Sequence, residues 1–117
     1  MKKVLLVIAL MMMSCQAVYA TPPPTGNEFV NQWQEYKKHK AGQSFDVVNS
    51  SYYMGYVNGI AEAGYFIGWF SHPVGTTTDQ ICAVVGKWIE DHPERWTDRP
   101  FTIVTTALRK AFPLPKK

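Results

Sequence analysis

The sequence predicts an all-α protein, a small single-domain bundle of about four main helices. Apolar residues recur at helical spacing in four stretches after residue 27, and no stretch shows the sustained alternation of apolar and polar residues that is typical of strands. No Asn-Gly hairpin signal is flanked by strand-like runs. The chain is long enough for one compact domain with a modest core, so no second domain is expected.

Residues 1–20 are typical of a secretory signal peptide. Two lysines precede the apolar run 4–13, and Val18-Tyr19-Ala20 places small residues at the two positions that a signal peptidase reads. Cys15 offers lipid attachment as an alternative, although the residues before it match a lipobox poorly. No later apolar stretch reaches about 18 residues, so we expect no membrane span.

Residues 21–27 follow as a Pro-rich tether, because three consecutive prolines cannot continue a helix. The domain itself is expected to span 28–117. Its first helix is predicted from about Glu28 to Lys38, and lysines near its end suit the negative end of the helix dipole. The apolar side of this helix is formed by Phe29, Val30, Trp33 and Tyr36.

The second helix is predicted from about Phe45 to Phe66 and should be central, because it is apolar almost all round. Gly55, Gly59 and Ala63 recur every four residues, so they form one smooth stripe on which another helix can lie unusually close. Each glycine costs a helix up to about 1 kcal/mol relative to alanine. We therefore interpret the stripe as a packing seam and not as a binding site.

An aromatic loop separates this helix from the third, and it is the best candidate for function. Trp69, Phe70, Ser71 and His72 lie between two glycines, and aromatic residues are common anchors of protein interfaces. The alternative is that the loop folds back over the end of the core. The residues alone leave both interpretations open.

The last two helices have clear boundary signals. Thr77 and Gln80 have the spacing of a capping box, and Pro93 should end the third helix near Asp91. The last helix is predicted to begin around Asp98, with a proline in its first turn and prolines beyond its end. Its apolar stripe is formed by Phe101, Val104, Leu108 and Phe112.

Composition and spacing argue against an enzyme, a metalloprotein or a nucleic-acid binder. The three histidines are scattered, no Cys-x-x-Cys pair exists, and the chain is almost neutral once the signal is removed. We expect no cofactor, no metal and no nucleic-acid partner.

Glu62 lies either at the rim of the bundle or inside it with hydrogen-bond partners, and Cys82 is either an inert core residue or a nucleophile. A small hydrolase that uses one of these two groups is therefore a further hypothesis.

Three segments, taken together, resemble the Rap/Tai family of immunity proteins. They are Tyr53-Met54-Gly55-Tyr56-Val57-Asn58-Gly59-Ile60-Ala61-Glu62-Ala63, then His92-Pro93-Glu94-Arg95, then Ala111-Phe112-Pro113. The resemblance implies a periplasmic, non-catalytic protein that binds and inhibits a peptidoglycan amidase delivered by type VI secretion. It also implies a homodimer, which would hide an aromatic surplus that includes four tryptophans. A periplasmic helical adaptor without a toxin partner is the alternative.

The chain departs from this family at two positions. Many members carry a cysteine just before the proline of the loop and another directly after Ala-Phe-Pro, and the two are thought to form a disulfide. Here Ser71 and His72 precede Pro73, and Leu114 follows Pro113. Both ends of the bridge are absent, so a bridge-less domain is expected to be less stable by about 2–4 kcal/mol and to hold its loop more loosely.

Overall fold

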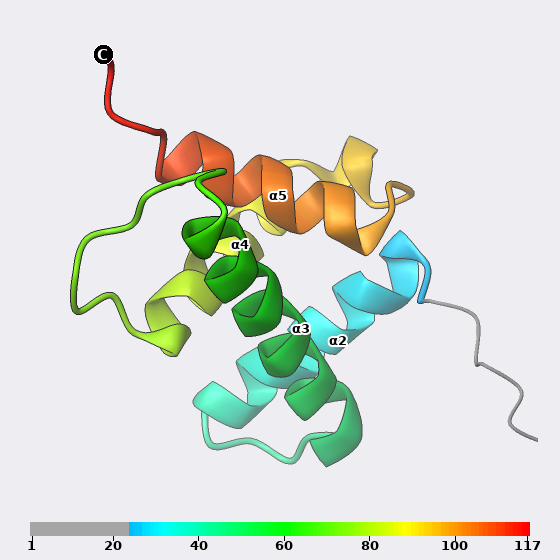
Figure 1. The fold of residues 1–117 in the computed structure, drawn as a ribbon. Coiled ribbons are helices and arrows are strands. Elements are labelled where there is room, and N and C mark those ends of the chain that lie inside the picture. Colours follow the sequence, from blue (N-terminus) through cyan, green and yellow to red (C-terminus); the bar gives the residue numbers. More distant parts are fainter. Residues whose placement is uncertain (1–23) are drawn as a thin grey trace, which may run out of the picture.

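The computed structural model describes residues 24–117 and shows a bundle of four α-helices (Figure 1). The described residues contain no strand, which confirms the all-α prediction. The predicted signal peptide, Cys15 and residues 21–23 of the predicted tether lie outside the described residues. The elements, in chain order, are α2 (Gly26–Lys40), α3 (Val47–Phe66), α4 (Thr78–Asp91), the short 3-10 helix η2 (Pro93–Arg95) and α5 (Pro100–Ala111).

Helix α2 begins two residues earlier than predicted, so the end of the predicted tether is helical. The reason is a capping box: the hydroxyl of Thr25 accepts from the backbone N–H of Glu28, and the Glu28 carboxylate accepts from the N–H of Thr25 at 2.6 Å. These bonds satisfy two N–H groups that the helix end would otherwise leave free. The helix continues to Lys40, two residues past the predicted end.

Helix α3 is the central element, as predicted, and it contacts α2, α4 and α5. Asp46 caps it by accepting from the N–H of Asn49, which explains why it begins at Val47 and not at Phe45. The Tyr53 hydroxyl donates to the Cys82 carbonyl at 2.8 Å and so joins α3 to α4 through the core. The buried side of α3 is formed by Ser50, Tyr53, Val57, Ala61 and Gly64.

The predicted packing seam is not formed within the described chain. Gly55, Gly59 and Ala63 are all exposed, and a Cβ added at either glycine would meet no atom within 4 Å. Val57 and Ala61 lie on the opposite side of α3 and are buried in the core, so the small residues face outward. Within residues 24–117, no helix lies on this stripe.

Helices α4 and α5 follow the prediction closely. Thr77 and Gln80 form the expected capping box, and α4 ends at Asp91. Helix α5 begins at Pro100, two residues later than predicted, because Asp98 is held in the preceding turn. There its N–H donates to the Arg95 carbonyl at 3.0 Å, and its carboxylate accepts from Arg95 Nε at 2.6 Å.

All four tryptophans are buried or half-buried. Trp33 and Trp88 are each 7% exposed, and Trp69 and Trp96 are half-buried.

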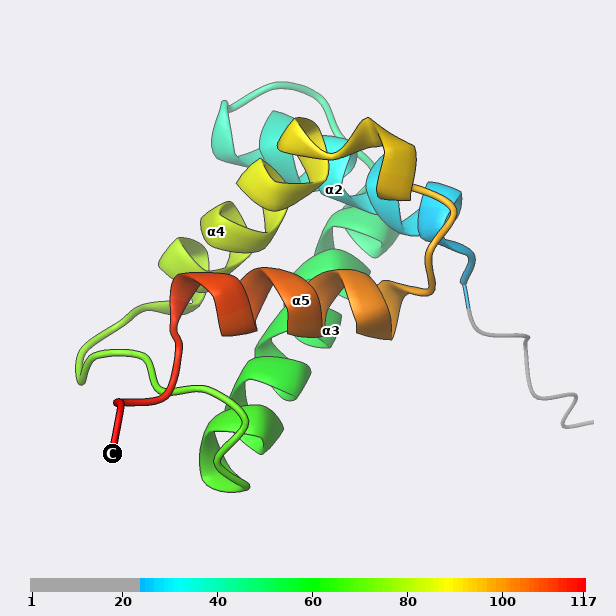
Figure 2. The ribbon, with the colours of Figure 1, turned by 90° about the horizontal axis from the view of Figure 1, so that it is seen from above.

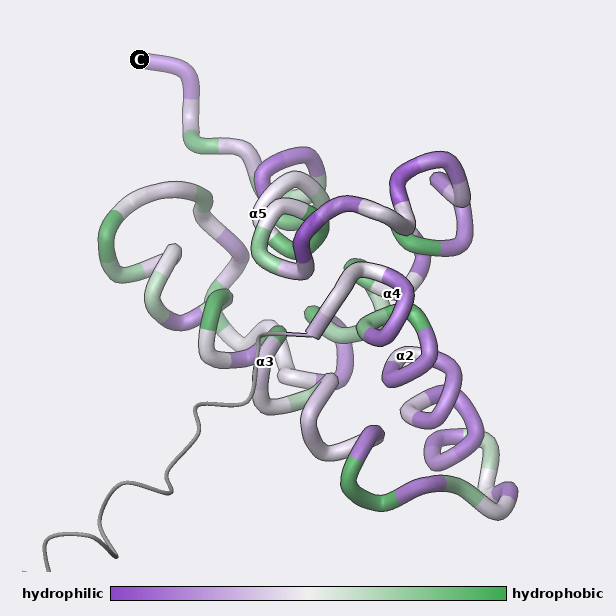
Figure 3. Tube along the Cα trace, turned by 90° about the vertical axis from the view of Figure 1, so that its right-hand side faces the viewer, coloured by the Kyte–Doolittle hydropathy of each residue, from purple (hydrophilic) through white to green (hydrophobic). Residues whose placement is uncertain are grey.

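Figure 3 shows α2 as largely hydrophilic, whereas the start of α3 and the loop after it contain hydrophobic stretches. No helix in residues 24–117 has the length and hydrophobicity needed to cross a bilayer. The large hydrophobic residues that are exposed include Tyr52, Tyr65, Phe66, Val74 and Phe101.

Candidate functional site

The loop between α3 and α4 begins with a sharp reversal that places one predicted anchor in the core. Gly68 has a positive φ of 77°, which lets the Trp69 N–H turn back to the Gly64 carbonyl at 2.8 Å. The Phe70 ring then lies on the backbone of Gly64, where an added Cβ would be 2.4 Å from its Cζ. Phe70 is only 1% exposed, so it covers the core and cannot contact a partner.

Trp69, Ser71 and His72 hold the loop against α5 and against Phe112, which follows it. The indole of Trp69 packs edge-on against Phe101 and lies 5.4 Å from the Arg109 guanidinium. The Ser71 N–H donates to the Phe112 carbonyl at 3.0 Å. The His72 ring is stacked at 4.6 Å on Tyr65 and lies edge-on to Phe112.

These contacts join the two segments that the family disulfide would link. The loop and the end of α5 are therefore neighbours in the absence of the bridge, as the resemblance implied.

The tip of the loop, residues 73–76, contains its most exposed large hydrophobic residue, and the sequence interpretation did not single it out. Val74 is 99% exposed, and Gly75 has a positive φ of 88°. The N–H and the hydroxyl of Thr76 both donate to the Pro73 carbonyl, at 3.2 and 2.6 Å, and so close a turn. The signal was available in the Pro-Val-Gly sequence, since proline and glycine on either side of one apolar residue are typical of a turn that presents it.

Apolar side chains are also exposed at the end of α3, where the loop begins. Tyr65, Phe66 and Ile67 are 46%, 90% and 56% exposed. The loop from Ile67 to Thr77 contains no lysine, arginine, aspartate or glutamate. Burying this surface against a partner therefore removes water from apolar groups without stripping it from charges. We name the set Tyr65, Ile67 and Val74 the loop patch.

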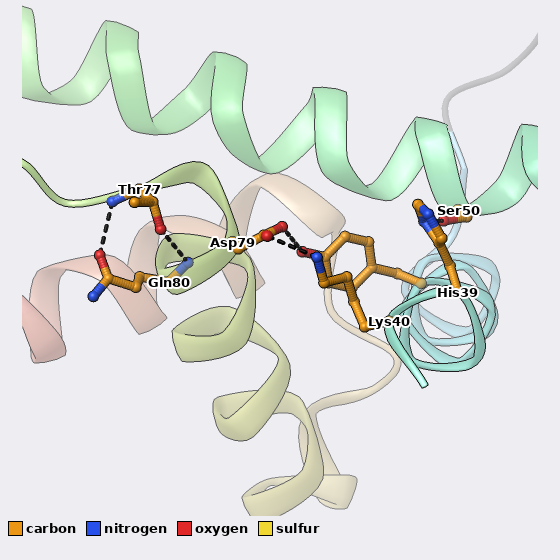
Figure 4. Close-up of polar contacts among 7 residues, drawn as sticks. His39, Lys40, Ser50, Thr77, Asp79 and Gln80 are labelled. Carbon is orange, nitrogen blue, oxygen red and sulfur yellow. Dashed lines mark hydrogen bonds and ion pairs between the residues drawn. The ribbon is translucent and has the colours of Figure 1, made fainter. Parts of the chain in front are cut away.

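A polar cluster joins the end of α2 to the start of α4 (Figure 4). The Tyr36 hydroxyl donates to Asp79 Oδ1 at 2.5 Å, and Lys40 Nζ donates to Oδ2 at 2.7 Å. The hydrogen bond from Lys40, followed by that from Tyr36, lowers the pKa of Asp79. Beside it, His39 Nδ1 lies 3.2 Å from the Ser50 hydroxyl. The carboxylate is paired on both oxygens, so this cluster links helices.

The two groups considered for hydrolysis lie apart and lack catalytic partners. Glu62 is exposed, as the rim interpretation expects, and accepts from Asn58 Nδ2 at 3.1 Å. Cys82 has no exposed surface, and burial raises the pKa of its thiol to about 11. Among residues 24–117, no three His, Cys, Asp or Glu side chains are grouped closely enough to hold a metal ion. Within the described chain, the titratable groups that do gather, around Asp79, pair with one another between helices.

Comparison with protein families assigns the chain. The family model for Rap1a immunity proteins matches residues 25–114, which include all four described helices and the loop. Comparisons with curated proteins and with solved structures found no significant match. The chain belongs to the Rap1a immunity protein family.

Proposed function

We propose that this member of the Rap1a immunity proteins acts in the periplasm, where it binds a peptidoglycan amidase delivered by type VI secretion and blocks its active site. The main support for placing the contact surface at the loop is that the loop contains no Lys, Arg, Asp or Glu and that Val74 at its tip is 99% exposed. A narrow apolar tip fits a concave site on another protein, since enzyme active sites are clefts with largely apolar walls. Inhibition of this kind needs no catalytic group on the immunity protein.

The partner surface in this proposal consists of the loop patch with Ser71 beside it. Trp69 and His72 act by holding the loop against Phe101 and Phe112. Phe70 acts only through the core. The sequence predicts the contact at residues 69–72, whereas in this proposal it lies closer to the loop tip at Val74.

The first experiment tests the function. The protein is co-produced with a candidate cysteine-peptidase-type amidase from a neighbouring gene, and both are exported to the periplasm. We expect a stable complex, inhibited peptidoglycan cleavage in vitro and survival of the producing cells. Recovery of no such enzyme, together with no protection, would contradict the amidase proposal and favour a periplasmic adaptor.

The second experiment tests the surface. Val74→Asp should weaken amidase binding at least about tenfold, because it places a charge in an apolar contact. Val47→Asp is the matched control. Val47 is also exposed, at 63%, but it lies at the start of α3, whereas the loop follows the end of that helix. Both variants should keep the wild-type melting temperature. Equal affinity of Val74→Asp and wild type would contradict the contact surface while leaving the immunity function intact.

We also propose that the protein is a homodimer, as the family resemblance implies. The exposed aromatic residues Tyr52, Tyr65, Phe66 and Phe101 support this proposal, because water contact with large apolar side chains is unfavourable. Light scattering over a concentration series should give the dimer mass at micromolar concentration.

A further inference from the structure

The lysines and arginines of residues 24–117 form two groups that differ in their partners. Up to residue 98, each of them forms an ion pair with a carboxylate. They are Lys37, Lys38, Lys40, Lys87 and Arg95. Those from residue 99 onward are all exposed, and none forms an ion pair within the part of the chain that the structure describes. They are Arg99, Arg109, Lys110, Lys116 and Lys117.

The acidic residues are distributed in the opposite way. All nine of them lie outside the segments 63–78 and 99–117. These two segments pack together, because the Ser71 N–H donates to the Phe112 carbonyl at 3.0 Å. Figures 1 and 2 both show the C-terminal tail on the same side of the molecule as the loop. We name the loop 67–77 together with residues 109–117 the acid-free end.

The carboxylates next to the acid-free end leave it positively charged. Asp91 and Lys110 line the same hollow between α4 and α5, but Asp91 is already paired with Lys87, whose Nζ lies 2.8 Å from Oδ2. Glu62 precedes the loop by more than one helical turn of α3 and is a single negative charge beside four cations. The electrostatic potential at this end is therefore positive, and it attracts acidic surfaces at distances up to about 10 Å in ordinary salt.

The surface of the acid-free end is shaped and not flat. Val74 protrudes at the loop tip, where it is 99% exposed. Beside it, a hollow of about 520 Å³ lies between the tip and Phe112, and Ala83 and Val84 of α4 also line it. None of the residues that line this hollow is charged. A protruding side chain beside a hollow fits another folded protein, because interfaces between proteins are shape-complementary, whereas a membrane surface is flat on this scale.

The cations flank the uncharged loop from α5 and from the tail. The Arg109 guanidinium lies 5.4 Å from the Trp69 ring, which holds it beside the loop. Lys110 follows it in the last turn of α5, and Lys116 and Lys117 end the tail. The acid-free end thus combines an apolar centre with a positive rim, which is the usual division of an interface into core and rim.

From these observations we infer that the amidase carries acidic side chains around an apolar cleft, and that the acid-free end attracts and orients it. The loop patch then fills the cleft, and Lys110, Lys116 and Lys117 face the acidic rim. This inference rests on the proposed function, because the loop patch is the contact surface proposed there. Charges at a rim act mainly on the association rate, whereas the apolar contact sets the dissociation rate.

The test measures both rates for the purified candidate amidase by surface plasmon resonance. The association rate should fall at least about tenfold between about 20 and about 300 mM NaCl, because salt screens the attraction. At low salt, the triple variant Lys110→Gln/Lys116→Gln/Lys117→Gln should associate at least about fivefold more slowly than wild type and dissociate at nearly the same rate. Val74→Ala should show the reverse pattern, because it removes apolar contact and no charge.

The matched control removes the same amount of charge from cations outside the acid-free end. It is the triple variant Lys37→Gln/Lys38→Gln/Arg95→Gln, whose cations are paired on α2 and η2. Its association rate should differ from that of wild type by less than about twofold, because the attraction is local. Circular dichroism should show full helix content in both triple variants.

The outcomes separate this inference from the proposed function. An association rate that is independent of salt, or equal in wild type and the Lys110 triple variant, would overturn the inference and leave the immunity function intact. If no complex forms, the proposed function fails and the inference with it. Sedimentation with phosphatidylglycerol vesicles should leave the wild-type protein in the supernatant at about 150 mM NaCl. Vesicle binding that the same variant loses, together with salt-independent amidase association, would assign the acid-free end to an anionic membrane.

Discussion

The indole of Trp33 on α2 lies directly on the backbone of Gly86 on α4, where an added Cβ would be 2.2 Å from Cη2 of the ring. The same edge of the ring is fixed one turn further along α4, because Trp33 Nε1 donates to Glu90 Oε1 at 3.3 Å. Lys37 forms an ion pair with the same carboxylate and lies over the indole. This contact sets the distance between the first and third helices of the bundle.

Gly86→Ala is expected to lower the free energy of unfolding by about 1–3 kcal/mol, because its methyl group would overlap the Trp33 ring. Gly59→Ala is the matched control and should raise that free energy by about 0.5–1 kcal/mol in the monomer, since it removes a helix-interior glycine without a clash. Urea denaturation followed by circular dichroism measures both. A stabilising Gly86→Ala would contradict the packing described.

Phe70→Ala should cost about 3–5 kcal/mol of stability, as truncation of a buried aromatic residue does. Val74→Ala, four residues further along the same loop, should change stability by less than about 0.5 kcal/mol, because Val74 is in solvent. Thermal unfolding of the two variants separates the core part of the loop from its tip. Equal melting temperatures would show that Phe70 does not cover the core.

The Asp79 carboxylate should make the protein more acid-sensitive. Its pKa is lowered in the folded state, so its contribution to stability is present above the unfolded value of about 4 and is lost as the pH falls through the folded pKa. Asp79→Asn should therefore be less stable than wild type at pH 7, with a smaller difference at pH 3. The contribution is modest, because Asp79 is exposed. Urea midpoints at the two pH values measure it, and a constant difference would contradict the assignment.

The Cys82 thiol should be inert in the folded protein. It has no exposed surface, and burial raises its pKa to about 11, so at pH 8 little thiolate is present and reagents cannot reach it. Labelling by a disulfide reagent at pH 8 should be at least about 100-fold slower in native protein than in guanidinium. Rapid labelling of the native protein would reopen the hypothesis of a nucleophilic cysteine.

Most of the fold was predictable because its signals are local. Thr77 with Gln80 sets the start of α4, Pro93 sets its end, and the pattern of apolar residues identified the four α-helices of residues 24–117, although not the short helix η2. The shifts of two residues at α2 and α5 arise from side-chain caps and turns whose partners cannot be chosen from spacing alone.

By itself, the sequence determined that this chain is an all-α protein with these four helices and with the motifs of its family. Only the tertiary structure decided which glycines are packed: Gly64 and Gly86 are covered by aromatic rings, whereas Gly55 and Gly59 face outward. It also placed Phe70 in the core and Val74 at the exposed tip. The physical reason is that helical periodicity defines the sides of a helix, whereas the side that is buried depends on how distant aromatic residues pack together.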